Sequence, residues 1–76
     1  MEKESVKYDY TRLNGIIVEK FGTRRNFAKE IGKMSETKLS LKLNNVYKFT
    51  QDEIVRAATL LEIPKDLVWD YFFTEV

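Results

Sequence analysis

The chain has no cysteine, no histidine, one proline and three glycines among its 76 residues. Without cysteine no disulfide can form, and without cysteine or histidine the common zinc ligand sets are missing. The same absences remove the most frequent general base of enzymes and the thiol nucleophile. The three glycines are isolated and form no phosphate-binding loop. We therefore expect a protein that is not an enzyme and that has no cofactor, no metal site and no small-molecule ligand.

Long hydrophobic runs are also missing. No stretch approaches the roughly 20 apolar residues that a membrane-spanning helix needs, and no apolar run follows the charges at the N-terminus. Hydrophobic residues nevertheless make up 43% of the sequence and aromatic residues 13%, which favours a packed core over disorder. We expect a cytoplasmic protein without a membrane partner. It would have a flexible tail over residues 1–7 and one domain over residues 8–76.

Hydrophobic spacing predicts two helices joined by a tight turn between residues 23 and 45. Phe27, Ala28 and Ile31 share one helical face, and Leu39 and Leu43 share another. Each segment is preceded by a hydroxyl residue that can accept a hydrogen bond from the first helical turn. The two predicted N-caps are Thr23 and Ser35, and the turn between the segments contains Gly32.

Three further helices are predicted from local signals. A helix from residue 10 to 21 would have Asp9 as N-cap and Gly22 just past its end. Thr50 and Glu53 have the spacing of a capping box, so a helix should begin there. Pro64 should end that helix and open a last one. The expected fold is all-α, a compact domain of five helices.

Charge is unevenly distributed along the sequence, although the net charge is only +1. Residues 1–19 carry three basic and four acidic side chains, residues 20–48 eight basic and two acidic, and residues 49–76 two basic and six acidic. The positive part coincides with the predicted helix pair. A basic segment of this kind is typical of a polyanion site, and equally of lysines that are simply solvated.

The helix pair resembles the helix-turn-helix of the lambda-repressor-like (Cro and repressor) class of DNA-binding domains. The resemblance rests on Ala28, Gly32, Ser35, Leu39 and Ser40 in their order and spacing. The turn is one residue longer than in that class, with Lys33 as the insertion. The opening KYDYTRLNG, the stretch LSLKLNN and the closing DYFF also resemble short phage and prophage proteins of low-GC Gram-positive bacteria.

The resemblance implies a DNA-binding regulator that works on the nucleoid of a bacterial host. Residues 35–45 would lie in the major groove of double-stranded DNA while the preceding helix braces on the backbone. The implied DNA-binding residues are Arg24, Arg25, Ser35, Glu36, Thr37, Lys38, Ser40, Leu41, Lys42, Asn44 and Asn45.

These residues would divide between base reading and phosphate contact. Glu36 could accept from cytosine, and Thr37 and Leu41 could contact a thymine methyl group. Lys38 and Lys42 would pair with phosphates. In the resembled class, the residue matching Arg24 contacts the backbone, and the loop matching Asn44 and Asn45 grips phosphate. Simpler alternatives are that Glu36 favours the helix dipole, that the lysines are solvated, and that the asparagines cap the helix.

The last helix has more apolar side chains than one buried face can hold. Leu67, Val68, Tyr71 and Phe72 form one stripe, and Trp69 with Phe73 points elsewhere. Such exposed apolar groups commonly mark an interface, although Trp69 could instead cover the edge of a small core. Members of the resembled class often pair through their last helix. We therefore expect a homodimer. Its interface would contain Trp69, Phe72 and Phe73.

These expectations favour a sequence-specific repressor of Cro type that acts by occupying operator DNA. Two alternatives remain open. One is a protein-interaction module, such as an antirepressor or an antitoxin, that uses the aromatic C-terminal helix. The other is a structural or packaging protein that binds DNA without reading its sequence.

Overall fold

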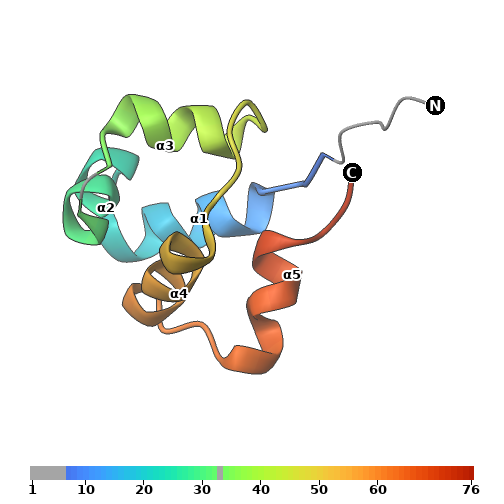
Figure 1. Cartoon of the computed structure of the whole chain (residues 1–76). Helices are drawn as coiled ribbons and strands as arrows, with labels where there is room; N and C mark the ends of the chain where they lie inside the picture. Colours follow the sequence, from blue (N-terminus) through green and yellow to red (C-terminus); the bar gives the residue numbers. More distant parts are fainter. Residues whose placement is uncertain (1–6, 33) are drawn as a thin grey trace.

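Five α-helices follow one another in the computed structural model, which describes residues 7–32 and 34–76 (Figure 1). This arrangement confirms the predicted all-α class and the number of helices. None of the helices in the described ranges is long and apolar enough to cross a membrane. The helices are α1 (Thr11–Phe21), α2 (Arg24–Ile31), α3 (Glu36–Leu43), α4 (Gln51–Leu60) and α5 (Val68–Phe72), the last preceded by a 3₁₀ turn, η1 (Lys65–Leu67).

Hydroxyl side chains begin three of the helices, as predicted. The Thr23 hydroxyl accepts from the Asn26 amide at 3.1 Å and so caps α2. The Ser35 hydroxyl accepts from the Lys38 amide at 3.1 Å and caps α3. At α4 the Thr50 hydroxyl accepts from the Glu53 amide while the Glu53 carboxylate accepts from the Thr50 amide, which completes the capping box.

Three helix boundaries differ from the prediction. The helix α4 ends at Leu60, before Pro64, which was expected to end it. The first helix begins at Thr11, so Tyr10 rather than Asp9 occupies the N-cap position. Asp9 still accepts from the Thr11 amide and hydroxyl, at 2.9 and 2.6 Å, one residue outside the expected place. The segment after Pro64 forms the 3₁₀ turn before it becomes helical, which leaves α5 only five residues long.

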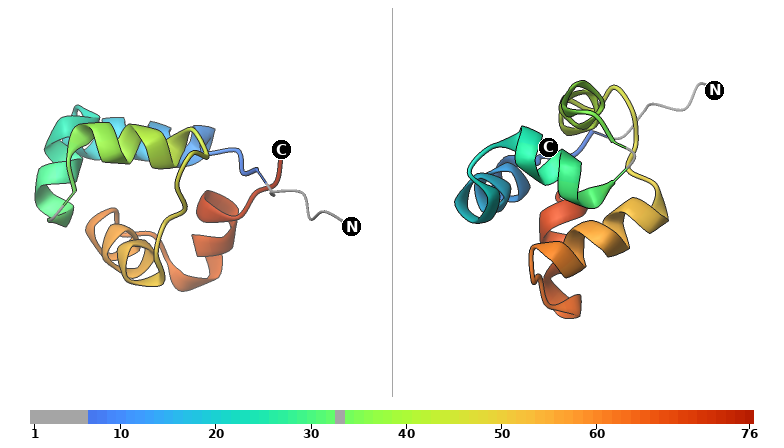
Figure 2. Two further views of the ribbon diagram at one scale, coloured as in Figure 1. Left: turned by 45° about the horizontal axis from the view of Figure 1, so that its top comes forward. Right: turned by 90° about the vertical axis from the view of Figure 1, so that its left-hand side faces the viewer.

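The core is centred on α2, which packs against α1, α3 and α4. In Figure 1 and in the right-hand view of Figure 2, α3 lies at one end of the molecule and α4 and α5 lie at the other, with α1 and α2 between them. The side chains that are almost completely buried come from all five helices or their ends. The largest of them are Phe27, Phe72, Leu13, Ile17, Leu39 and Leu61.

The two ends of the described chain are held together by backbone contacts. Tyr8 and Glu75 form an antiparallel bridge. The Asp9 amide donates to the Thr74 carbonyl at 2.7 Å, and the Val76 amide donates to the Lys7 carbonyl at 3.1 Å. Lys7 therefore takes part in the fold. Residues 1–6 of the predicted tail, and the predicted insertion Lys33, lie outside the described residues.

Candidate functional site

The helices α2 and α3 pack against each other across the short connection that contains Gly32. Gly32 adopts a φ of 82°, a left-handed conformation that L side chains rarely take. Ala28 is buried where the helices approach. The small residue and the glycine thus occupy the positions that the sequence pattern indicated.

The beginning of α3 is exposed. Ser35, Glu36, Thr37 and Lys38 are all exposed there. Farther along the helix, Ser40 and Leu41 are half-buried, which leaves them only partly accessible to a partner. Four of the predicted DNA-contacting residues therefore lie together on this exposed helix start, although the Ser35 hydroxyl is already used to cap α3.

Two predicted residues at the start of α2 have different surroundings. Arg25 is exposed, whereas Arg24 is half-buried and lines an open cleft. The same cleft is lined by Asn44 and by Asn14, whose side-chain oxygen is buried without a hydrogen-bond partner in the described part of the chain. Arg24 and Asn44 are thus brought together from opposite ends of the α2 and α3 pair.

Lys42 does not lie on the exposed face, so its predicted phosphate contact is corrected. Its side chain is only 7% exposed and its ammonium lies 2.9 Å from the Glu53 carboxylate. The same ammonium donates to the Lys48 carbonyl at 2.9 Å and lies over the Phe49 ring. The prediction was wrong because the charged end of Lys42 turns inward and joins α3 to the beginning of α4.

Glu53 is the acidic partner in this contact. Burial raises the pKa of Glu53, but hydrogen bonds from Lys42 and Thr50, together with the positive charge of Lys42, outweigh burial and lower the pKa overall. One carboxylate oxygen accepts from both the Lys42 ammonium and the Thr50 amide. Glu53 therefore completes the α4 capping box and neutralises a lysine of α3 at the same time.

Asn45 also has a structural role in place of the predicted phosphate contact. Its backbone is left-handed, with a φ of 66°, just beyond the end of α3. The Tyr8 amide donates to the Asn45 side-chain oxygen, and the Asn45 side-chain nitrogen donates to the Tyr8 carbonyl, both at 2.9 Å. The side chain thus holds the segment before α1 against the end of α3. Asn44 remains exposed.

The aromatic residues of α5 and its C-cap differ in exposure. Phe72 is 1% exposed and packs edge-on against Phe49, so its predicted place in a dimer interface is corrected. Trp69 is 69% exposed. Its ring stacks against Phe73 with the ring centroids 4.8 Å apart, and Phe73 in turn meets the edge of Tyr8 at 5.8 Å. An aromatic surface, Trp69 with Phe73 and Tyr8, therefore remains accessible on this side of the molecule.

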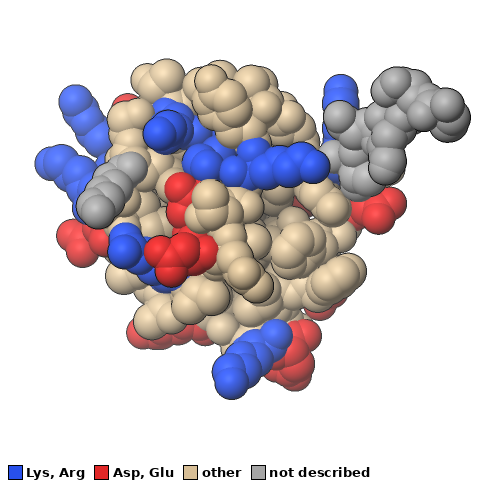
Figure 3. Space-filling view, in the orientation of Figure 1, with Lys and Arg blue, Asp and Glu red and all other residues tan. Residues whose placement is uncertain are grey.

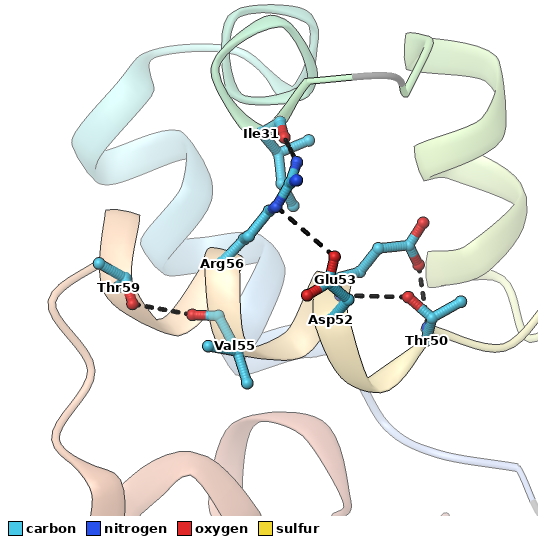
Figure 4. A network of polar contacts seen from close by, with 7 residues as sticks. All are labelled: Ile31, Thr50, Asp52, Glu53, Val55, Arg56 and Thr59. Atoms are coloured by element: carbon cyan, nitrogen blue, oxygen red, sulfur yellow. Dashed lines mark hydrogen bonds and ion pairs between the residues drawn. The ribbon is translucent and has the colours of Figure 1, made fainter.

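A network of polar contacts fixes α4 beneath α2 (Figure 4). Arg56 donates to the Ile31 carbonyl at 2.9 Å and forms an i,i+4 ion pair with Asp52 at 3.8 Å. Ile31 is the last residue of α2, so Arg56 satisfies a carbonyl that has no partner within its own helix. No sequence signal indicated this contact, because the two residues are 25 positions apart.

In the sequence, basic residues are concentrated between residues 20 and 48, but the charges on the surface of the folded protein are less clearly separated. Figure 3 shows basic side chains mainly over the upper half of the molecule, near α2, α3 and the linker to α4, with acidic groups among them. Two lysines of the basic segment are paired with acidic residues, Lys20 with Glu62 at 3.4 Å and Lys42 with Glu53. The exposed basic charge near α3 is therefore smaller than the sequence count indicates.

Comparison with known proteins places the chain in a family. Residues 6–75 match the family described as "Protein of unknown function (DUF739)". The chain belongs to this family. A search of curated proteins gives no match for this DUF739 member.

A solved structure adds a similar protein from a bacteriophage. This DUF739 member is similar to the modulator of repression (MOR) of the temperate bacteriophage TP901-1 from Lactococcus lactis, whose solution structure has been determined. The two sequences are 45% identical, the match covers 87% of this chain and 88% of that chain, and the TM-score is 0.74. The chain is thus similar, over most of its length, to a small phage regulator.

Proposed function

We propose that this protein is a small phage-type regulator that modulates repression by binding a protein partner, a DNA-binding repressor. The observation that carries the proposal is the 45% identity to a phage modulator of repression over nearly the full length of both chains. A protein that modulates repression must act on a repressor or compete at its operator. We favour the first route, which corresponds to the antirepressor alternative for this sequence.

The positions of two predicted DNA-contacting residues support a protein partner over DNA. Lys42 is held by Glu53 and the Lys48 carbonyl, and the Asn45 side chain is held by Tyr8. Each phosphate contact that is lost removes part of the salt-dependent affinity on which duplex binding depends. Because these two side chains make intramolecular contacts, the α3 surface has fewer groups that can bind the phosphates of a duplex.

The exposed aromatic surface supplies a suitable binding region for a protein. Tryptophan and tyrosine are enriched at the energetic centres of protein interfaces, because they bury a large area at low conformational cost. Trp69 is held by its stacking on Phe73, and Phe73 contacts Tyr8, so the surface is ordered before a partner arrives. We assign the repressor-binding surface to this aromatic group.

A second candidate function is sequence-specific DNA binding as a Cro-type repressor. It is favoured by the exposed residues Glu36, Thr37 and Lys38 at the start of α3 and by the exposed Arg25 of α2. In this reading α2 and α3 act as a helix-turn-helix, and Trp69 and Phe73 form the interface of a homodimer.

An operator-occupancy experiment separates the two functions. A repressor encoded in the same phage or prophage genome is bound to its operator at half saturation, and this protein is then added. The proposed function predicts that the occupancy of the operator changes at concentrations where the protein alone leaves the duplex unshifted. A shift of the operator by the protein alone would support the second candidate, and no effect on either species would contradict the proposed function.

A further inference from the structure

The segment before α1, the linker between α3 and α4, and α5 enclose a cavity of about 220 Å³ next to the aromatic surface. We propose that this cavity is a docking pocket for one large apolar side chain carried by an acidic protein segment. The inference rests on the proposed function, because it names the chemistry of the partner that the aromatic surface would bind. The lining residues are largely aromatic or aliphatic, among them Tyr8, Tyr10, Phe49, Ile54, Phe72 and Phe73.

The size of the cavity favours a single anchoring side chain over a complete small molecule. Pockets for small-molecule ligands usually enclose roughly 300–1,000 Å³, and this cavity is smaller. The half-buried side chains of Phe49 and Ile54 give a leucine or phenylalanine side chain an apolar surface against which to exclude water. Such a pocket for one buried anchor is the usual centre of a protein interface.

Hydrogen bonds hold each side of the pocket in place. Asn45 binds the Tyr8 backbone through both ends of its amide, which fixes one wall. The Lys42 ammonium donates to the Lys48 carbonyl and fixes the linker. On the third side, the Asp9 amide donates to the Thr74 carbonyl just after α5. Little rearrangement is therefore needed before an anchor enters, which lowers the cost of binding.

The two charged residues that line the pocket are both basic. Lys7 and Lys48 both line it and are exposed, and none of its lining residues is acidic. Within residues 7–32 and 34–76, neither lysine forms an ion pair. Carboxylates on either side of an apolar anchor would meet these ammonium groups when the anchor is inserted. A nucleic-acid backbone offers negative charge without an apolar anchor, so the aromatic interior selects for a protein segment.

The pocket is continuous with the exposed aromatic surface. Phe73 and Tyr8 line the cavity, and Phe73 also stacks against Trp69. One acidic segment can therefore fill the pocket and cover Trp69 in the same binding event. This arrangement makes the pocket and Trp69 neighbouring parts of a single docking site.

Three short peptides test the inference on the intact protein. The peptides are Glu-Asp-Leu-Glu-Asp, the same sequence with alanine in place of leucine, and Lys-Arg-Leu-Lys-Arg, all blocked at both ends. Binding is followed by the shifts of backbone amide signals in two-dimensional NMR spectra. We expect the acidic leucine peptide to shift the amides of Tyr8, Val46, Lys48 and Phe73, and the other two peptides to bind at least about fivefold more weakly.

Charge-reversal variants then test the role of the two lysines. We expect Lys48→Glu and Lys7→Glu each to weaken binding of the acidic leucine peptide about fivefold. Lys65→Glu, a change at an exposed lysine outside the pocket, should leave that binding unchanged. We expect each variant to fold, because Lys7 and Lys48 contribute only backbone atoms to the hydrogen bonds described above. The amide spectrum of each variant checks that it is folded.

Several outcomes would overturn the docking pocket. These are equal responses to all three peptides, shifts confined to other parts of the molecule, or shifts of the pocket amides by a random DNA duplex but not by the acidic peptide. The peptide experiment contains no repressor, so its result is separate from that of the operator experiment. A pocket that binds the acidic peptide in a protein without effect on a repressor would retain this inference and refute the proposed function.

Discussion

The Lys42 ammonium lies between α3 and the beginning of α4, where it pairs with the Glu53 carboxylate and donates a hydrogen bond to the Lys48 carbonyl. A lysine so placed is unavailable to a phosphate unless these contacts break first. Its removal would leave Glu53, whose side chain is 24% exposed, without its charged partner. The free energy of such a change is dominated by the desolvated group left behind.

We expect Lys42→Met to lower the free energy of unfolding by about 2 kcal/mol, because the apolar part of the side chain is kept while the charged contact is lost. The matched control is Lys38→Met at an exposed position of the same helix, which should change the free energy by less than about 0.5 kcal/mol. Urea denaturation followed by circular dichroism measures both. Equal effects of the two substitutions would contradict the buried position of Lys42.

Glu53 gives this contact a defined dependence on pH. Its pKa is lowered from 4.5 in the folded chain, so the folded state binds fewer protons than the unfolded state as the pH falls. The contribution of Glu53 to stability is therefore complete above pH 4.5 and is lost as the pH falls through the lower folded-state pKa.

We expect the free energy of unfolding of the unmodified protein to fall more steeply than that of Glu53→Gln between about pH 6 and pH 3. Hydrogen bonds from Thr11 also lower the pKa of Asp9, but that group is present in both proteins and cancels in the comparison. Urea denaturation at a series of pH values measures the difference. Parallel curves over the whole range would show that Glu53 is not engaged in the folded state.

Local sequence signals were sufficient to predict where helices begin, but they could not predict contacts between residues far apart in the sequence. Thr23, Ser35 and Thr50 could be predicted as helix starts, because a cap bonds to an amide three residues away. The role of Asn45 could not be predicted, since Tyr8 is 37 positions distant. The same reason hid the contact between Lys42 and Glu53, which depends on how the linker returns α4 to α3.

The C-terminal helix shows how length limits a pattern-based prediction. Helical spacing correctly separated the exposed Trp69 from Phe72, which is buried, and from Val68 and Tyr71, which are half-buried, but it also placed Leu67 in that stripe, and Leu67 is exposed. Phe72 was nevertheless also assigned to an interface, although it is 1% exposed and packs against Phe49. The pocket beside α5 could not be predicted at all, because its lining comes from three separate parts of the chain.

The capping box of α4 provides a test at the same scale. We expect Thr50→Ala to lower the free energy of unfolding by about 1 kcal/mol, because the Glu53 amide loses its acceptor. Thr59→Ala is the control within the same helix, since its hydroxyl donates only to the Val55 carbonyl one turn earlier. The control should change the free energy by less than about 0.5 kcal/mol. Thermal or urea denaturation of the two variants would contradict the account if Thr59→Ala cost as much as Thr50→Ala.

At the scale of the whole molecule, two surfaces compete for a functional role. One surface contains the polar residues at the start of α3 and the exposed Arg25 of α2, and the other contains Trp69 with Phe73 and Tyr8 beside the pocket. The buried position of Lys42 removes a predicted phosphate contact from the first surface, and the buried position of Phe72 removes a predicted dimer contact from the second. Both weaken the interpretation as an operator-binding dimer. The similarity to a phage modulator of repression agrees with a protein partner. We therefore propose that recognition occurs at the aromatic surface.

The most direct test is a calorimetric titration of the phage or prophage repressor into this protein without DNA. We expect saturable binding that Trp69→Ala weakens by about tenfold or more. We also expect Arg25→Ala and Val55→Ala, which alter exposed residues elsewhere, to leave the affinity unchanged. The contradicting result is a repressor that does not bind, together with salt-dependent binding of the protein to a DNA duplex that Arg25→Ala weakens.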